Sequence, residues 1–227
     1  MFHPSDKPME RGWVGRIDGD RVLHLAAQTL QSFFLGGGGA REHAEYRLDD
    51  VTLVVPVLYP PAVRVFDAPG AFTFANPAGV LGPGEPITAP ARAESLSLLP
   101  RVAAVVGAEG AIGGFSLFAD WRAPGETPPK DRDFGSTLGP VVVTTDELDA
   151  TDLEITVRVD GDERLTATQT GFAWEPARAL AAVGTALRPG DLLVSPAAGE
   201  LAGVLRGSEV ALDAPGIGFL QTAVKEE

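Results

Sequence analysis

Glycine and proline interrupt this 227-residue chain so often that it cannot be built mainly from long helices. The 27 glycines and 19 prolines are about a fifth of the sequence, whereas roughly an eighth is typical. They stand between short apolar runs rather than in one low-complexity tract. Because 44% of the residues are hydrophobic, the chain can bury a core, and the pattern predicts a mostly β protein with many turns.

Short segments carry the clearest strand signals. Residues 96–107 are almost entirely apolar, which is typical of a strand that is buried on both faces. Residues 153–168 and residues 13–25 each surround an Asp-Gly pair, so both predict β-hairpins with tight turns. Residues 48–57 are predicted as a further strand, and residues 72–90, which Gly and Pro break repeatedly, as a loop.

One segment, residues 175–187, has the pattern of a helix. Pro176 stands near its start, its middle is rich in alanine, and Arg188-Pro189-Gly190 stops it. The predicted fold class is thus mostly β, of the α+β type, with one main helix. We expect a small N-terminal β region over residues 1–60 and a larger β domain over residues 61–227.

Composition excludes several classes of function. The chain has no cysteine, which rules out disulfides, thiolate metal sites and a cysteine nucleophile. It has only three histidines, and 31 Asp and Glu against 18 Lys and Arg give a formal net charge of −13. Nucleic-acid binding depends on clustered Lys and Arg that neutralise phosphates, so this acidic chain argues against it.

No segment is expected to enter a membrane. The first eight residues, MFHPSDKP, lack the basic and apolar regions of a signal peptide. The most apolar segment, residues 51–63, is interrupted by Pro56, Pro60 and Pro61 and is shorter than the roughly 20 residues that a membrane helix needs. We therefore expect a cytoplasmic protein without nucleic-acid or membrane partners.

A series of short motifs follows a fixed order along nearly the whole chain. The later motifs are 133–140 (DFGSTLGP), 143–148 (VTTDEL), 187–192 (LRPGDL) and 216–222 (GIGFLQT). The earlier ones are 15–25, 48–61, Asn76-Pro77, 81–87 (LGPGEPI) and 118–121 (FADW). As an ordered set, these motifs resemble the fumarylacetoacetate hydrolase family.

The resemblance implies a mixed β-roll or sandwich that usually forms a homodimer. Members of the family cleave a carbon–carbon bond in β-diketo acids, or decarboxylate or tautomerise related keto acids, with Mg²⁺ or Ca²⁺. Carboxylate oxygens hold such a hard ion, and the ion stabilises an enolate. A His paired with a Glu activates water, while a Lys and a Gly-Thr loop support the developing charge.

The metal-binding positions of the family differ in this chain. The two metal-binding Glu residues precede an Ala-Val-Val-Gly-like run and fall on Leu99 and Arg101, so both carboxylates are missing. The metal-binding Asp before Trp is present as Asp120, before Trp121. The Ser-Ala-Arg-Asp that normally follows reads Arg-Ala-Pro-Gly from Arg122 onward. One carboxylate beside a cation at Arg101 holds a divalent ion poorly, so we predict no metal and no cofactor.

The remaining catalytic positions differ as well. The family Lys falls on Arg132, and the Gly-Thr-Pro loop reads Ser-Pro-Ala-Ala from Ser195 onward, without the Thr hydroxyl. The lid that should carry the catalytic His between Pro61 and Asn76 is reduced to residues 62–75, which contain neither His nor Glu. We therefore predict that the lid is deleted.

Arg101 indicates what replaces the metal. An Arg inside an apolar run needs a partner when it is buried, and the resemblance places Asp120 near it. We predict an ion pair between these two residues, with Arg122 or Arg132 nearby. The pair is then either a structural salt bridge in a dead site, or part of a pocket whose Arg side chains bind a carboxylate or enolate without metal. The candidate catalytic residues are Asp120, Arg101 and Arg132, and the candidate substrate-binding residues are Arg122, Trp121 and Ser195.

Two other residues are weaker candidates. His43 follows the glycine run beside Glu42 and Glu45 and is interpreted as a solvated loop residue. Ser195 lacks the Gly-x-Ser-x-Gly setting and the evident His partner of a serine nucleophile.

Two functional hypotheses follow from the sequence. In the first, the chain is a degenerate, non-catalytic family member that serves as a binding or structural partner, as a homodimer or beside an active paralogue. In the second, it is a repurposed metal-independent enzyme that decarboxylates, isomerises, dehydrates or cyclises a small keto or enol carboxylic acid. We favour the first, because metal ligands, base, lid and Gly-Thr loop are missing together. An open, water-filled groove at Arg101 fits the first hypothesis, and a closed apolar cavity with converging Arg side chains fits the second.

Overall fold

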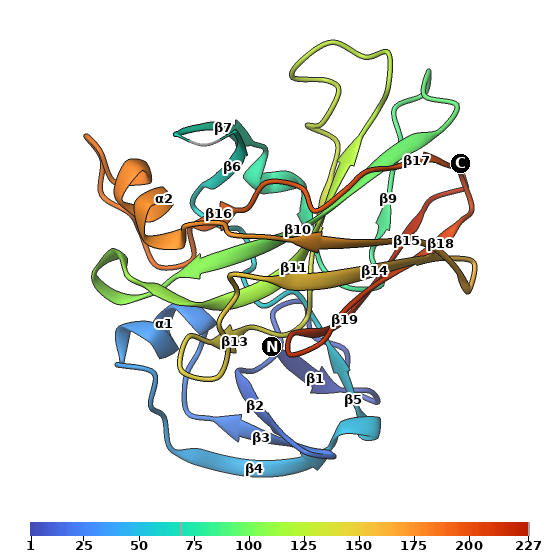
Figure 1. The fold of residues 1–227 in the computed structure, drawn as a ribbon. Coiled ribbons are helices and arrows are strands. Elements are labelled where there is room, and N and C mark those ends of the chain that lie inside the picture. The colour runs from blue at the N-terminus through green and yellow to red at the C-terminus, as the bar shows by residue number, and fades with distance from the viewer. Residues whose placement is uncertain (69, 227) are drawn as a thin grey trace.

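The computed structural model describes residues 1–68 and 70–226 and confirms a mostly β fold (Figure 1). Within this described part, the α-helices are α1 (Leu30–Leu35) and α2 (Trp174–Ala181), and neither is long and apolar enough to cross a membrane. Three short 3₁₀ turns lie at Leu48–Asp50, Pro77–Gly79 and Ala108–Gly110.

A mixed sheet of nine strands is the largest element of the fold. Its strand order is β7-β6-β16-β10-β11-β12-β8, with β13 paired to β11 and β17 paired to β10. The strands are β6 (Val63–Ala68), β7 (Ala71–Ala75), β8 (Val80–Leu81), β10 (Leu96–Val106), β11 (Ile112–Arg122), β12 (Ser136–Leu138), β13 (Val143–Thr144), β16 (Leu192–Val194) and β17 (Leu201–Val204). The pairs β6–β16 and β8–β12 are parallel, whereas the central pair β10–β11 is antiparallel.

Three smaller sheets complete the described structure. The five-stranded one has the order β15-β14-β18-β19-β9, and two N-terminal ones have the orders β2-β3-β4 and β1-β5. The five strands are β9 (Pro86–Ile87), β14 (Leu153–Val159), β15 (Asp162–Gln169), β18 (Glu209–Ala214) and β19 (Gly218–Val224). The N-terminal strands are β1 (Phe2–Pro4), β2 (Gly15–Asp18), β3 (Arg21–Leu25), β4 (Glu42–Arg47) and β5 (Val51–Leu53). The domain division after residue 60 stays a prediction.

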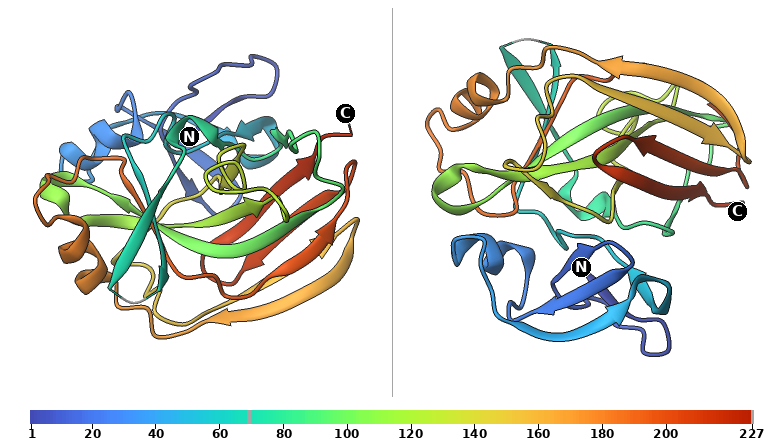
Figure 2. Two further views of the ribbon diagram at one scale, coloured as in Figure 1. Left: turned by 90° about the horizontal axis from the view of Figure 1, so that it is seen from above. Right: turned by 60° about the horizontal axis from the view of Figure 1, so that its bottom comes forward.

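The large sheet is covered on both faces. Figure 2 shows the N-terminal strands on one side of β10 and β11 and the strands β14, β15, β18 and β19 on the other. Val102 of β10 packs in the core that includes the five-stranded sheet, whereas the next residue, Ala103, packs in a second core with Phe34 and Val57. Because successive residues of a strand point to opposite faces, β10 is buried on both sides, as predicted.

The predicted hairpins are confirmed, but the helix prediction is not accurate. Strands β14 and β15 are joined through Asp160 and Gly161, which both take left-handed backbone, and β2 and β3 pair around the other Asp-Gly turn. Helix α2 ends at Ala181 rather than near residue 187, since the chain turns at Gly184, whose φ is +72°. Left-handed backbone at a glycine is a common way to end a helix.

The short helix α1 was not expected from the sequence. Its six residues precede the glycine run directly, so they look like the end of an apolar stretch. The start is fixed by a capping box, in which Thr29 Oγ1 accepts from the Ser32 N–H at 3.0 Å and Ser32 Oγ accepts from the Thr29 N–H at 3.0 Å. Phe34 is buried and anchors the helix in the second core.

Two further expectations need correction. Residues 72–90, expected as a loop, contain most of β7 and all of β8 and β9. Strands β8 and β9 pair in parallel with β12 and β19, which are distant in the sequence, so local patterns do not reveal them. Residues 48–57, expected as one strand, contain a 3₁₀ turn and then only the short strand β5.

A buried ion pair holds β6 against the neighbouring strand β16. Arg64 Nη1 donates to Asp191 Oδ2 at 3.0 Å, and both side chains are buried. The same oxygen accepts the backbone N–H of Arg188 at 3.1 Å, which closes the turn that leads into β16. This pair anchors β6, the strand that also carries Asp67.

We expect Asp191→Asn to lower the free energy of unfolding by about 3–5 kcal/mol, because the Arg64 charge stays buried without its counter-charge. Urea denaturation followed by circular dichroism measures this change. The control is Glu42→Gln in the exposed Arg16–Glu42 pair, whose 2.8 Å contact should contribute less than about 1 kcal/mol. Equal effects of the two variants would contradict a stabilising role of the buried pair.

Candidate functional site

The two central strands bring Arg101 and Asp120 together. In the β10–β11 register, Leu99 lies opposite Asp120 and Arg101 lies opposite Phe118, so Arg101 and Asp120 are diagonal neighbours on one face of the sheet. Arg101 Nε lies 2.9 Å from Asp120 Oδ2, and both side chains are 1% exposed. The N–H of this nitrogen is not well enough aligned with the oxygen to form a hydrogen bond, so the contact is an ion pair. The predicted pairing is confirmed.

The three nitrogens of Arg101 each contact a different partner. In addition to the contact with Asp120, Nη1 donates to the Ser195 carbonyl oxygen at 2.9 Å and Nη2 donates to Asp67 Oδ1 at 2.6 Å. The planar guanidinium suits such a divided arrangement, which a lysine ammonium cannot reproduce. The arginine is therefore held in one orientation by three separate segments of the chain.

Ser195 contacts Arg101 through its backbone carbonyl rather than through its hydroxyl. Its carbonyl binds Arg101, while its Oγ accepts the Val102 N–H at 3.0 Å and donates to the Pro196 carbonyl at 2.9 Å. The side chain is completely buried. The hydroxyl is thus engaged in joining β10 to the segment after β16, and this residue positions Arg101.

Two further arginines converge on the same oxygen of Asp120. Arg122 Nη2 lies 3.2 Å from Asp120 Oδ2 and Arg132 Nη2 lies 3.3 Å from it. Arg122 also contacts Asp131 at 3.4 Å, and Arg132 donates to Thr73 Oγ1 at 3.1 Å. The prediction that Arg122 or Arg132 lies nearby therefore holds for both residues.

Asp67, at the end of β6, completes the arrangement from the solvent side. Its Oδ1 contacts Arg101 at 2.6 Å and Arg122 at 3.7 Å, and its Oδ2 contacts Arg132 at 3.5 Å. Its side chain is 46% exposed, while those of its arginine partners are 1%, 21% and 10% exposed. We use the name Arg–Asp cluster for Asp67, Arg101, Asp120, Arg122, Asp131 and Arg132.

Sequence reasoning missed Asp67 and Asp131. Asp67 is the only acidic residue of residues 62–75, where the family resemblance implies a His and a Glu rather than an Asp. The available signal was electrostatic. Three arginines around one Asp leave an uncompensated positive charge, and buried charges require partners.

The pKa values of Asp67 and Arg132 are both lowered, for different reasons. Partial burial raises the pKa of Asp67, but the charge and hydrogen bond of Arg101, with the charges of Arg132 and Arg122, outweigh it and hold the pKa below its usual value. Burial lowers the pKa of Arg132, and the opposing effect of Asp120 does not cancel this shift. With three arginines and three aspartates, the cluster is neutral when all six groups are charged.

Trp121 does not join the cluster. It follows Asp120 in β11, and adjacent residues of a strand point to opposite faces. Its side chain is completely buried in the core that includes the five-stranded sheet, together with Leu98 and Val102. The structure therefore places this predicted substrate-binding residue in the core, away from the arginines.

The donor set does not fit a hard divalent ion. No group of three His, Asp or Glu side chains that could hold a metal lies among residues 1–68 and 70–226. Asp120 Oδ1 is buried without a hydrogen-bond partner, but the other oxygen of this carboxylate faces three guanidinium groups. Calcium prefers six to eight oxygen ligands and magnesium near-octahedral ones, which this surrounding does not supply.

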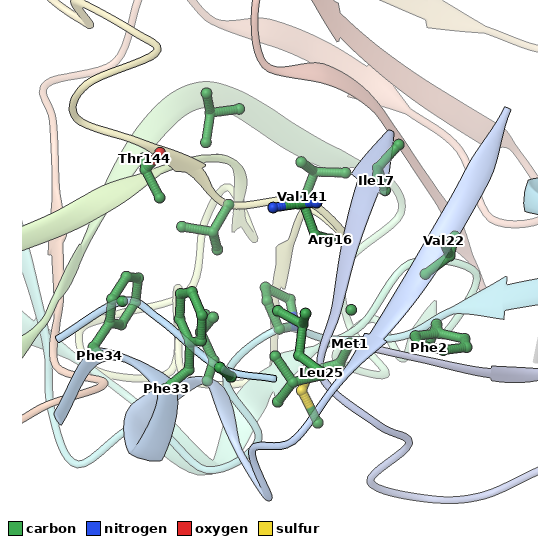
Figure 3. A pocket seen from close by; sticks show the side chains of 18 of the residues that line it. Met1, Phe2, Arg16, Ile17, Val22, Leu25, Phe33, Phe34, Val141 and Thr144 are labelled. Carbon is green, nitrogen blue, oxygen red and sulfur yellow. The ribbon is translucent and has the colours of Figure 1, made fainter. Parts of the chain in front are cut away.

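Two hollows lie away from the cluster. A cavity of about 420 Å³ is lined by apolar side chains of the N-terminal region, including Leu25, Phe33 and Phe34, and by residues around Val141 (Figure 3). A more open groove is bordered by Trp13, His24 and His43, and no cluster residue lines either hollow. His43, interpreted as a solvated loop residue, is exposed but lies in strand β4. Burial, and then the charge of His43, lower the pKa of His24 in the adjacent strand β3.

We expect Arg101→Met to lower the free energy of unfolding by about 3 kcal/mol, the lower end for a broken buried pair, because Arg122 and Arg132 still neutralise Asp120. Chemical denaturation measures the loss. Arg21→Met, in the exposed pair with Glu45 at 2.7 Å, serves as the control and should cost less than about 1 kcal/mol. A stability of Arg101→Met equal to that of the wild type would show that the cluster does not support the fold.

Asp67→Asn should change how stability depends on pH. Because the folded pKa of Asp67 lies below the ordinary value of 3.8, its ionised form stabilises the protein above that value, and the contribution disappears as the pH falls through the lowered pKa. The difference in unfolding free energy between wild type and Asp67→Asn should therefore be constant near neutral pH and shrink in acid. Urea titrations between neutral and acidic pH test this, and a difference that grows in acid would contradict it.

A family model described as fumarylacetoacetate (FAA) hydrolase C-terminal matches residues 57–225. Maleylpyruvate hydrolase from Sphingobium sp. SYK-6 has a similar structure, with a TM-score of 0.81, 19% identity and coverage of 95% of this chain and 97% of that chain. It has also been solved with manganese(II) and pyruvate.

Two further solved structures share the fold. Fumarylacetoacetate hydrolase from Exiguobacterium antarcticum matches with a TM-score of 0.80 and 21% identity over 96% of each chain. The 5-carboxymethyl-2-hydroxymuconate delta-isomerase from Mycobacterium smegmatis matches with a TM-score of 0.76 and 22% identity, over 99% of this chain and 97% of that one. No curated protein is significantly similar in sequence.

Proposed function

The chain belongs to the fumarylacetoacetate hydrolase family, and we propose that it is a metal-independent member that does not perform metal-dependent carbon–carbon hydrolysis. The observation that supports this most is the buried ion pair between Arg101 and Asp120. By the resemblance, Arg101 stands at a position where the family has a metal-binding Glu, and Asp120 is the remaining acid. A fixed guanidinium then takes the place of the exchangeable cation.

Electrostatics supports this proposal. At an effective dielectric constant of about 20, two like unit charges about 4 Å apart repel each other by about 4 kcal/mol. A divalent ion bound to Asp120 would face three guanidinium groups that already contact this carboxylate at 2.9–3.3 Å. Its binding would require moving at least one buried arginine away from its acceptors.

The segment expected to carry the lid supports the proposal in a second way. Residues 62–75 contain β6 and β7, which pair as a hairpin, and they contribute Asp67 and Thr73 to the surroundings of the arginines. They contain no His or Glu, the pair of residue types that would activate water in the family reaction. We propose that the family's catalytic base is absent.

A metal titration tests the proposal. Mn²⁺ binding is followed by isothermal titration calorimetry and by electron paramagnetic resonance, and cleavage of an acylpyruvate is assayed with and without Mn²⁺. We expect no binding tighter than about 1 mM, which corresponds to about 4 kcal/mol, and no cleavage stimulated by the metal. The Sphingobium maleylpyruvate hydrolase, solved with manganese(II), is the positive control. One equivalent of Mn²⁺ bound to the wild type and lost in Asp120→Asn would overturn the proposal.

A second candidate function is binding or conversion of a small keto or enol carboxylic acid at the same arginines without metal. It is favoured by the accessible outer edge of the cluster, where Asp67 is about half exposed and Arg122 and Arg132 are partly exposed. Paired N–H groups of arginine match the oxygens of a carboxylate. Metal-free turnover of a β-keto acid that Asp120→Ala abolishes would establish an enzyme and refute the non-catalytic form of the proposal.

A further inference from the structure

Asp67 contacts the three arginines in the manner of a bound ligand. Its two oxygens are shared among Arg101, Arg122 and Arg132. We infer that the Asp67 carboxylate occupies an anion-binding subsite formed by these arginines, and that a small monocarboxylate of the keto- or enol-acid class binds there by displacing it. This inference rests on the second candidate function, metal-free recognition of a carboxylic acid at the cluster.

The buried Arg101 needs a hydrogen-bond acceptor in this subsite, whether Asp67 or a ligand supplies it. Arg101 is 1% exposed, and its Nη2 donates to Asp67 at 2.6 Å. A buried charged donor that loses its acceptor loses much of its stabilisation. An incoming carboxylate would satisfy the same N–H group, so exchange of one carboxylate for another preserves the hydrogen bonding of the buried arginine.

The two aspartates on either side of the arginines differ in burial. Asp120 lies beneath them with 1% exposure, whereas Asp67 covers them from outside with 46% exposure. When Asp67 withdraws, water can solvate its half-exposed carboxylate, whereas a withdrawn Asp120 carboxylate would stay buried without a partner. Asp67 is therefore the member that a ligand can replace at least cost, and Asp120 stays in place.

Asp67 lies at an irregularity in the β6–β7 pairing. The β6–β7 register is irregular between Val65 and Ala68, so Asp67 falls outside the regularly paired residues of the hairpin. Its side chain can turn toward solvent without separating a paired residue of the ladder. Arg64, by contrast, is held by the buried Asp191, which keeps the start of β6 fixed.

Charge and neighbouring groups define the class of ligand. Three arginines and three aspartates make the occupied cluster neutral, so withdrawal of Asp67 leaves one positive charge. A bound monoanion brings the net charge of the cluster back to zero, whereas a dianion would leave one negative charge. Thr73 Oγ1, which accepts from Arg132 at 3.1 Å, keeps its own O–H free to donate to a keto or enol oxygen next to the carboxylate.

Pyruvate is the probe for the test, measured by isothermal titration calorimetry against wild type, Asp67→Asn and Asp67→Ser. We expect both variants to bind pyruvate at least about tenfold more tightly than the wild type, because no internal carboxylate competes. Methyl pyruvate, which lacks the charge, should not bind. Asp133→Asn, which removes the same charge from a residue paired with Lys130 at 2.7 Å, is the matched control and should leave the affinity unchanged.

The possible results separate this inference from the functions proposed above. Equal, measurable affinities in wild type and both Asp67 variants would overturn the competition by Asp67 and leave carboxylate binding standing. No pyruvate binding in any variant would overturn both the inference and the second candidate, while metal independence is decided separately by the Mn²⁺ titration. A gain in Asp133→Asn equal to that in Asp67→Asn would mean a general charge effect and would also overturn the inference.

Discussion

The ion pair between Arg101 and Asp120 is the interaction on which the rest of the site depends. It lies on the two longest strands, buried between layers, where an unpaired charge would be very costly. Asp120 balances the charge of Arg101, while Ser195 and Asp67 accept hydrogen bonds from its two terminal nitrogens. The neutrality of the whole cluster follows from the same requirement, since each added arginine must be matched by a carboxylate.

A guanidinium at this place changes the chemistry that the fold can support. A divalent ion can be exchanged, can bind two substrate oxygens at once and acts as a Lewis acid. Arg101 is covalently fixed, keeps a constant charge and can only donate hydrogen bonds. Such a centre can still orient a carboxylate, but it polarises a keto oxygen far less than a metal does. This limit is why carboxylate recognition is better supported here than carbon–carbon cleavage.

The sequence was sufficient where the structure depends on local patterns or on ordered motifs. The apolar run of β10, the Asp-Gly hairpins and the pairing of Arg101 with Asp120 were all predictable. The short strands β8 and β9 were not, because each is stabilised by a partner distant in the chain. Trp121 illustrates a signal that was present but unused, since strand alternation alone places it on the face opposite to Asp120.

The position of the Asp67 side chain distinguishes the degenerate site of the first hypothesis from the carboxylate-binding site of the second. With Asp67 on the arginines, the cluster is a closed, neutral salt-bridge network, which is what a degenerate site would contain. With Asp67 withdrawn, the same atoms form a positively charged subsite with buried donors directed outward. A purely structural network would be expected to bury this acid with its buried partner Arg101, since water screens the exposed side of the pair. The exposure of Asp67 is thus the property that a purely structural role does not explain, and it connects the stability of the cluster to its capacity for binding.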